Sequence, residues 1–183
     1  MLNFRGAKFI KSATSKLDRP EKKLKEILFV GRSNVGKSSL INALVDNKSL
    51  CFTSSKPGHT RLLNYFEIKD TCYLVDAPGY GFANLNKSKK RKFGLMMEDY
   101  LTNRENLKQV FMLIDFRHKP SSDDIMMYDF LKYYKLPVTI VATKSDKIGI
   151  TKHQTQRNMI LNDLELVVGD DFVVFSNVNK EGK

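Results

Sequence analysis

The chain has 183 residues, a length that favours one domain large enough to bury a hydrophobic core. Its 42% hydrophobic and 28% charged residues are ordinary for a soluble globular protein, and they exclude disordered, collagen-like and disulfide-scaffold chains. No apolar run approaches the roughly 18 residues that a membrane span needs. No signal peptide is recognisable, and Cys51 and Cys72 are expected to be reduced thiols of a cytoplasmic protein.

The net charge of +11 is concentrated in two segments of the chain. Residues 1–26 carry eight Lys or Arg and three Asp or Glu, and residues 87–92 read Lys-Ser-Lys-Lys-Arg-Lys. Concentrated positive charge predicts a polyanionic partner, because phosphate contacts dominate affinity for nucleic acids. The alternative is a solvated, lysine-rich surface without a partner.

Apolar strand patterns alternate with helical patterns along the chain. Strands are expected at 8–11, 27–30, 62–68, 72–75, 110–114, 138–142 and 172–175, and helices at 38–45, 87–101, 123–134 and 152–164. This alternation predicts an α/β protein with a mostly parallel sheet that helices cover on both faces. Ligands of such folds bind at the carboxyl ends of the strands, so functional residues are expected directly after the strands.

A phosphate-binding pattern follows the strand expected at 27–30. Its residues are Gly31, Arg32, Ser33, Asn34, Val35, Gly36, Lys37 and Ser38, which match G-x-x-x-x-G-K-S between a strand and a helix. Such glycines let backbone N–H groups wrap around a phosphate at the start of the helix. Lys37 supplies a cation for the β- and γ-phosphates, and the Ser38 hydroxyl is a hard oxygen ligand for Mg²⁺. The pattern therefore predicts a P-loop.

A second motif follows the strand expected at 72–75 and consists of Asp76, Ala77, Pro78 and Gly79. An acidic residue at this strand end would hold Mg²⁺ through a water molecule. The Gly79 N–H could donate to a γ-phosphate, and loss of that phosphate would release the loop that follows.

Two loops after the last strands carry residues suited to reading a base. They are Thr143, Lys144, Ser145 and Asp146, and then Phe175, Ser176 and Asn177. The Asp146 carboxylate can accept from guanine N1–H and the 2-amino group, whereas adenine has no N1 donor and would leave the carboxylate unpaired. The Lys144 stem can lie along the base, and a backbone N–H beside Ser176 could meet guanine O6. These loops predict a guanine nucleotide.

The motifs together resemble those of translation-factor-type GTPases, and the flanking residues narrow the resemblance. The stretches GRSNVGKSSLIN, SSKPGHTRLLNYF, VDAPGYGFA, LIDFRHKPSSDDIMMYDFL and ATKSDK strongly resemble the EngB/YihA/YsxC family of bacterial GTP-binding proteins. The resemblance extends from about residue 8 to residue 182. The segment LIDFRHKP, residues 113–120, is specific to that family rather than to GTPases in general.

This resemblance implies a Ras-like P-loop GTPase fold with a mostly parallel six-stranded sheet, one antiparallel strand and helices on both faces. Residues 1–183 would form a single G domain with 1–26 as a basic extension that includes a possible strand, and the final helix that other members have after this point is expected to be absent. The ligands would be GTP or GDP and Mg²⁺. Two departures are His59, where a basic or polar residue is usual, and Phe93, where a tryptophan is expected.

The resemblance also assigns switch I, around Thr60, whose hydroxyl would ligate Mg²⁺ in the GTP state, and switch II, which Asp76 to Gly79 match. The neighbouring residues of the nucleotide site would be Gly58, His59, Arg61 and Leu62. The metal site would then consist of Ser38, Thr60 and, through water, Asp76.

No Gln or Glu occurs between Asp76 and Phe93, where many GTPases have a water-positioning glutamine. Hydrolysis is therefore expected to be slow until a partner or an ion completes the site. The residues expected to act in catalysis are Lys37, Thr60, Gly79 and Asn34. An asparagine at the position of Asn34 coordinates K⁺ in related GTPases, and the alternative is that it only braces the loop.

The implied function is a monomeric, nucleotide-gated switch in assembly of the large ribosomal subunit, associated with septation and cell division. Contact with ribosomal RNA is expected through the basic N-terminus and through Lys87, Lys89, Lys90, Arg91 and Lys92. One alternative is a guanine-nucleotide-gated RNA-binding module with negligible hydrolysis. A P-loop kinase is disfavoured because such enzymes do not need the T-K-x-D loop. Arg117 and His118 are expected to be structural rather than catalytic.

Overall fold

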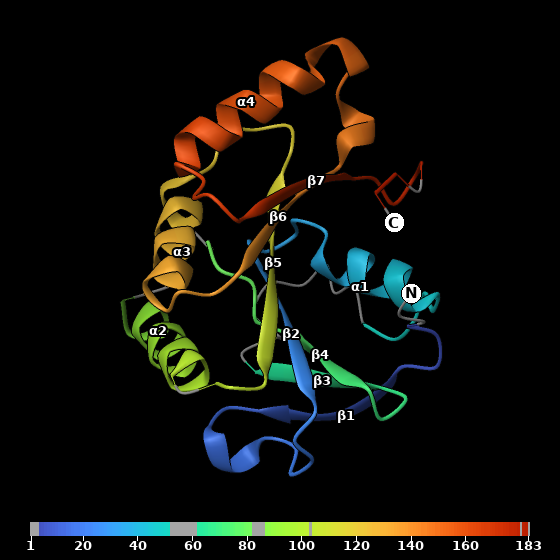
Figure 1. The fold of residues 1–183 in the computed structure, drawn as a ribbon, viewed down its shortest axis with the longest axis vertical. Coiled ribbons are helices and arrows are strands. Elements are labelled where there is room, and N and C mark those ends of the chain that lie inside the picture. Colours follow the sequence, from blue (N-terminus) through green and yellow to red (C-terminus); the bar gives the residue numbers. More distant parts are fainter. Residues whose placement is uncertain (1–3, 52–61, 82–86, 103, 180, 183) are drawn as a thin grey trace.

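Strands and helices alternate along the chain in the computed structural model, which describes residues 4–51, 62–81, 87–102, 104–179 and 181–182 (Figure 1). The strands are β1 (Lys8–Ala13), β2 (Lys25–Gly31), β3 (Leu63–Ile68), β4 (Cys72–Asp76), β5 (Leu107–Asp115), β6 (Val138–Thr143) and β7 (Asp171–Phe175). The helices are α1 (Lys37–Val45), α2 (Lys87–Leu101), α3 (Ser122–Tyr133) and α4 (His153–Leu164). Short 3₁₀ turns are η1 (Lys16–Asp18), η2 (Ser145–Lys147) and η3 (Ile150–Lys152).

The strands form one sheet in the order β1-β3-β4-β2-β5-β6-β7. Four pairs are parallel: β4 with β2, β2 with β5, β5 with β6, and β6 with β7. Strand β3 runs antiparallel to both of its neighbours, β1 and β4. The mostly parallel sheet with one antiparallel strand is thus confirmed. Within the described residues the sheet has seven strands rather than six, because β1 pairs with the outer edge of β3.

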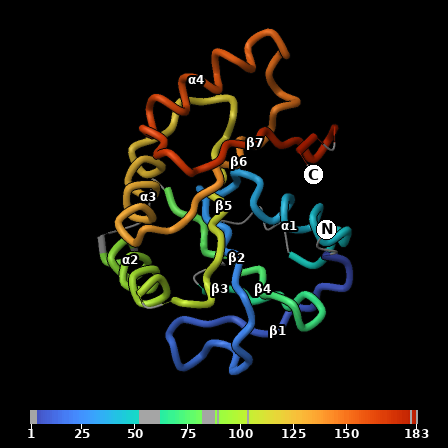
Figure 2. Tube along the Cα trace, in the orientation of Figure 1, coloured from blue at the N-terminus to red at the C-terminus, as the bar shows by residue number. Residues whose placement is uncertain are grey.

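Helices cover both faces of the sheet, as expected. Helices α2, α3 and α4 follow one another on one face and α1 lies on the other (Figure 2). Along β2 the side chains alternate between the two faces. Leu28 and Val30 pack in the layer under α2, α3 and α4, and Phe29 packs in the layer under α1. All three are essentially inaccessible to solvent. Burial on both faces explains why the strand reads as an unbroken apolar run.

The predicted elements are all present, and their ends shift by a few residues. The largest shift is at β5, which begins at Leu107 rather than at Val110. In the part of the chain that the structure describes, no helix combines the length and apolarity needed to cross a bilayer.

A buried ionic cluster joins the start of β2 to the end of α2. The Glu26 carboxylate, 5% exposed, forms an ion pair with Arg104 and accepts a 2.6 Å hydrogen bond from the Tyr100 hydroxyl. The Arg104 guanidinium lies over the Tyr100 ring, 5.0 Å from its centroid. Arg19 of the N-terminal extension lies 5.3 Å from the same centroid and pairs with Asp99 at 2.6 Å. The cluster therefore fastens the extension and α2 to the sheet.

Arg104→Met should lower the free energy of unfolding by about 4 kcal/mol, because the buried Glu26 carboxylate loses its counter-charge. The double variant Glu26→Gln/Arg104→Met removes the charge as well and should recover most of that loss, since the amide oxygen can still accept from Tyr100. Urea denaturation of the three proteins measures this. A double variant no more stable than Arg104→Met would contradict the ionic account.

Candidate nucleotide-binding site

The P-loop connects the end of β2 to the start of α1, where a phosphate-binding loop was predicted. Gly36 is the N-cap residue of α1 with φ 111°, and Asn34 also has a positive φ of 62°. Glycine and asparagine tolerate this left-handed region better than other residues. A Cβ on Gly31 would lie 2.9 Å from Val35 Cγ1 and 3.1 Å from the Leu113 carbonyl oxygen. The loop conformation therefore depends on these residue types.

Lys37 of the P-loop and Asp76 of the second motif meet at the carboxyl ends of β2 and β4. Lys37 Nζ forms an ion pair with Asp76 Oδ1, and their side chains are 10% and 7% exposed. Asp76 arrives there because β4 lies parallel to β2, with Asp76 opposite Phe29. A cation and a carboxylate thus share the place where the motifs predicted phosphate and Mg²⁺.

The oxygen donors at this point suit a hard cation. Asp76 offers a carboxylate, and Ser38 in the first turn of α1 offers a hydroxyl. No group of three or more His, Cys, Asp or Glu gathers among the residues that the structure describes. Mg²⁺, which prefers oxygen ligands and usually binds through one or two carboxylates plus phosphates, fits this donor set better than a transition metal does.

The start of switch II lies directly on the P-loop. A Cβ added to Gly79 would stand 2.6 Å from Ser33 Oγ and 2.9 Å from the Ser33 backbone nitrogen. The Ser33 N–H donates to the Tyr80 carbonyl at 3.0 Å, and the Tyr80 N–H donates to the Gly31 carbonyl at 3.3 Å. This close approach to Ser33 requires glycine at position 79.

Tyr80 turns away from the nucleotide edge. Its ring is buried in the layer beneath α2 and α3, and its hydroxyl donates to Asp124 Oδ1 at 3.0 Å. Asp124 also forms the capping box at the start of α3, where its other oxygen accepts from the Ser121 N–H at 2.8 Å. Burial raises the pKa of the Tyr80 phenol well above its ordinary value, so the group stays neutral. Tyr80 is an anchor of switch II in this structure, not a group facing the phosphates.

The loop after β6, predicted to contact the base, is hydrogen-bonded to the P-loop. The Thr143 hydroxyl donates to the Val35 carbonyl at 2.6 Å, and Lys144 Nζ donates to the Asn34 carbonyl at 2.9 Å. Lys144 has a φ of 64°, in the left-handed region, and its ammonium group lies on the P-loop. The two predicted halves of the site, phosphate and base, are therefore one connected structure.

Asp146 and Ser176, predicted from separate loops, are in direct contact. The Ser176 hydroxyl donates to Asp146 Oδ1 at 2.8 Å and accepts from the backbone N–H groups of Val178 and Asn179. The hydrogen bond from Ser176 lowers the pKa of Asp146 below its ordinary value, so the carboxylate is ionised at neutral pH. An ionised carboxylate is the form that accepts two donors from guanine.

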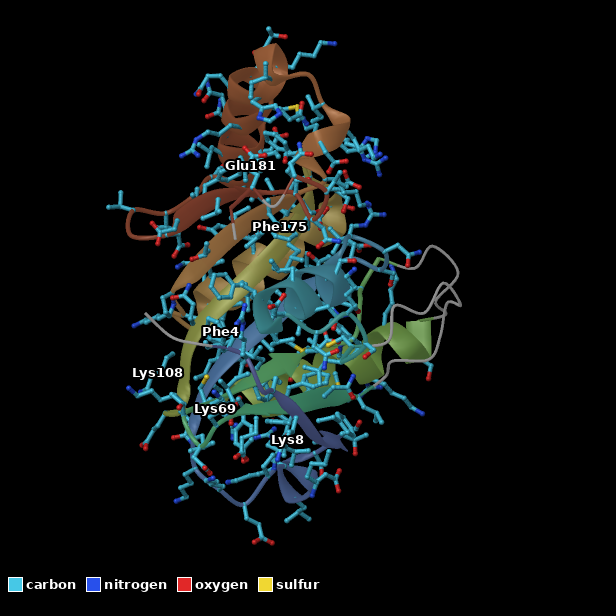
Figure 3. The ribbon with its side chains drawn as sticks, turned by 90° about the vertical axis from the view of Figure 1, so that its right-hand side faces the viewer. Phe4, Lys8, Lys69, Lys108, Phe175 and Glu181 are labelled. Atoms are coloured by element: carbon cyan, nitrogen blue, oxygen red, sulfur yellow. The ribbon has the colours of Figure 1, made fainter. Side chains whose placement is uncertain are left out.

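The C-terminal turn adds a contact that sequence reasoning missed. The Ser145 hydroxyl donates to Glu181 Oε2 at 2.6 Å, and the Ser176 N–H donates to the Glu181 carbonyl at 3.1 Å. Glu181 and Phe175 lie at the same end of the molecule (Figure 3). Glu181 belongs to no motif, so its contacts with Ser145 and Ser176 could not be predicted from residue type or spacing.

The remaining predicted residues are placed as follows. Arg32, Ala77, Pro78 and Asn177 lie in the loops that bound this edge, and Leu62 immediately precedes β3. Gly58, His59, Thr60 and Arg61 fall outside the described residues, as do the side chains of Lys87 and Lys89.

Comparison with known proteins supports a GTPase. Residues 26–144 match a family model described as "50S ribosome-binding GTPase". A "Probable GTP-binding protein EngB" from Streptococcus pneumoniae is 51% identical over 181 residues, which are 99% of this chain and 93% of that protein.

Solved structures agree with the sequence comparison. A crystal structure of "a probable GTP-binding protein engB" superimposes with a TM-score of 0.69 at 26% identity, covering 85% of this chain and 91% of that one. Era from Aquifex aeolicus, bound to GDP and AlF₄⁻, superimposes with a TM-score of 0.63 at 25% identity, covering 86% of this chain and 52% of that one. The predicted Ras-like GTPase fold is confirmed.

Gly79→Ala should lower the free energy of unfolding by about 1–3 kcal/mol, because the new methyl group overlaps Ser33 and forces switch II off the P-loop. Gly94→Ala is the matched control. A methyl group on Gly94, inside α2, would meet no neighbouring part of the described chain within 4 Å, so this change should stabilise the chain by about 1 kcal/mol. Urea unfolding without nucleotide measures both, and equal effects of the two changes would contradict the close packing at Gly79.

Proposed function

Because the chain belongs to the EngB family of GTP-binding proteins, we propose that it is a GTP-gated switch that acts in assembly of the large ribosomal subunit. GTP and GDP would bind at the edge formed by the P-loop and the two base-reading loops, with Mg²⁺ held by Ser38, Thr60 and, through water, Asp76. The protein would act as a cytoplasmic monomer. Its association with septation and cell division would follow from ribosome supply.

The charge distribution along α2 carries this proposal. The helix begins with the exposed cations Lys90, Arg91 and Lys92 in its first two turns and has no acidic residue in its first turn and no basic residue in its last. Cations at a helix N-terminus oppose the helix dipole, so this arrangement does not serve the stability of the helix. The residues stand just after switch II, where their position would depend on the nucleotide. A polyanion such as ribosomal RNA explains both the charge and its place.

The basic N-terminal extension divides into two groups. Arg5 pairs with Asp46, Arg19 pairs with Asp99, and Lys22 pairs with Glu67 and Asp70. The other five cations are exposed, and none of them forms an ion pair with another described residue: Lys8, Lys11, Lys16, Lys23 and Lys25. The second group supplies free positive charge near the sheet edge at β1, and it would extend the RNA-binding surface.

Hydrolysis of GTP would be slow without a partner. Lys37 would neutralise the phosphates, Thr60 and Gly79 would contact the γ-phosphate side, and the buried Tyr80 side chain offers no group to orient water. A second candidate function follows from the same observation: a nucleotide-gated RNA-binding module with negligible turnover. Single-turnover hydrolysis with and without large subunits distinguishes the two.

Co-sedimentation with isolated large ribosomal subunits tests the main proposal. Binding should be stronger with a non-hydrolysable GTP analogue than with GDP. The triple variant Lys90→Gln/Arg91→Gln/Lys92→Gln should weaken binding and reduce the slope of log affinity against log salt by about 2–3.

The matched control is Lys119→Gln/Lys135→Gln/Lys152→Gln, which has the same net charge but changes lysines in the segments that flank α3 and precede α4 instead of lysines on α2. It should leave both affinity and slope close to those of the unaltered protein. Equal losses in the two triple variants would indicate only a general charge effect and would contradict an RNA contact at α2.

K⁺ would accelerate hydrolysis through the Asn34 side chain. Asn34→Gly is the informative variant, because glycine keeps the left-handed backbone at φ 62° and removes only the amide. Replacement of Na⁺ by K⁺ should raise the rate of the unaltered protein and not that of Asn34→Gly. Equal stimulation of both proteins would leave Asn34 with only its role in the loop conformation.

A further inference from the structure

The segment LIDFRHKP, residues 113–120, places a carboxylate between the two halves of the proposed nucleotide site. Asp115 is the last residue of β5, and it stands opposite Thr143 in the parallel pair with β6. Its side chain is 20% exposed. The nucleotide-binding motifs do not include Asp115, and the proposed chemistry does not use it.

Asp115 binds two cations at once. Its Oδ1 accepts from the Arg117 backbone N–H at 3.1 Å and from Arg117 Nε at 2.9 Å. Its Oδ2 accepts from the second guanidinium nitrogen of Arg117 at 2.7 Å and from Lys144 Nζ at 2.8 Å. Burial by itself raises the pKa of Asp115, but the hydrogen bonds from Arg117 and Lys144 outweigh it and hold the pKa below its ordinary value. The carboxylate therefore stays charged.

Lys144 is the residue that depends on this carboxylate. Its ammonium group bridges Asp115 and the Asn34 carbonyl of the P-loop, and its backbone lies in the left-handed region. A lysine stem is flexible and loses rotamer freedom when it is fixed in one geometry. With the ammonium held at both oxygens, the stem is fixed across the edge where a base would lie.

We propose that Asp115 is a positioning residue for the guanine site, which holds the Lys144 side chain against the base, with Arg117 fixing Asp115 by a bidentate contact. The inference rests on the proposed role of Lys144 in base binding. It gives the segment LIDFRHKP a function: the carboxylate and guanidinium set the geometry of a neighbouring loop.

A double-mutant cycle on Asp115 and Lys144 tests the proposal. Titration with fluorescent GDP and with a fluorescent GTP analogue gives the dissociation constants. Asp115→Ala should raise both by about tenfold, the scale of one lost hydrogen bond to a charged group. Asp115→Asn, whose amide oxygen can still accept from Lys144, should raise them less. The double variant Asp115→Ala/Lys144→Ala should bind no more weakly than Lys144→Ala alone, because Asp115 acts through Lys144.

The controls separate positioning from folding. Thermal unfolding without nucleotide reports whether each variant is folded. Lys119→Ala removes a cation from the loop after β5, which also contains Arg117. Lys119 pairs with Asp163 at 3.3 Å, so this change should leave nucleotide affinity unchanged.

Three results would overturn the proposal. If Lys144→Ala lowers affinity but Asp115→Ala does not, or if the two losses add, Asp115 only braces the turn after β5 and the base site stands without it. If Lys144→Ala itself leaves affinity unchanged, the proposed base site fails together with this inference.

Discussion

The parallel pairing of β2 with its neighbours is the constraint on which the site depends. A parallel sheet brings the carboxyl ends of its strands to one edge, and the register decides which residues meet there. Gly31 lies opposite Leu113, Asp115 opposite Thr143, and Thr143 opposite Phe175. Residues as distant in the sequence as Gly31 and Leu113 become neighbours through backbone hydrogen bonds alone. The side chains of the site then add cross-links to an arrangement that the sheet has already made.

These cross-links join loops that come from different strands. Lys37 reaches from α1 to Asp76 after β4, and Lys144 reaches from the loop after β6 to the P-loop and to β5. Ser176 joins the loop after β7 to Asp146. On the proposed function, a nucleotide would lie along these contacts, and its base and its phosphates would both contact one connected network of hydrogen bonds and ion pairs.

Much of this could be predicted from the sequence, because motifs and apolar periodicity are local signals. The P-loop residues, Asp76 and Asp146 are marked by residue type and spacing, and apolar runs such as 27–30 mark the strands. Contacts that depend on side-chain direction could not be predicted. Tyr80 follows a glycine in an irregular loop, where no periodicity indicates whether a ring faces the nucleotide or the core. The strand β1 was expected as a possible element, but its pairing with β3 depends on an edge that exists only in the folded sheet.

The burial of Tyr80 bears on how the proposed slow hydrolysis of GTP could become faster. The position after Gly79 is filled by an aromatic ring whose hydroxyl satisfies the buried oxygen of Asp124, which in turn caps α3. A glutamine at that position would leave a void in the core and an unsatisfied carboxylate, and it would gain nothing unless the backbone also turned round. On the proposed mechanism, hydrolysis without a partner would need several simultaneous changes to the present sequence. For a chain with such a tyrosine, a group supplied from outside is the shorter evolutionary route to fast turnover.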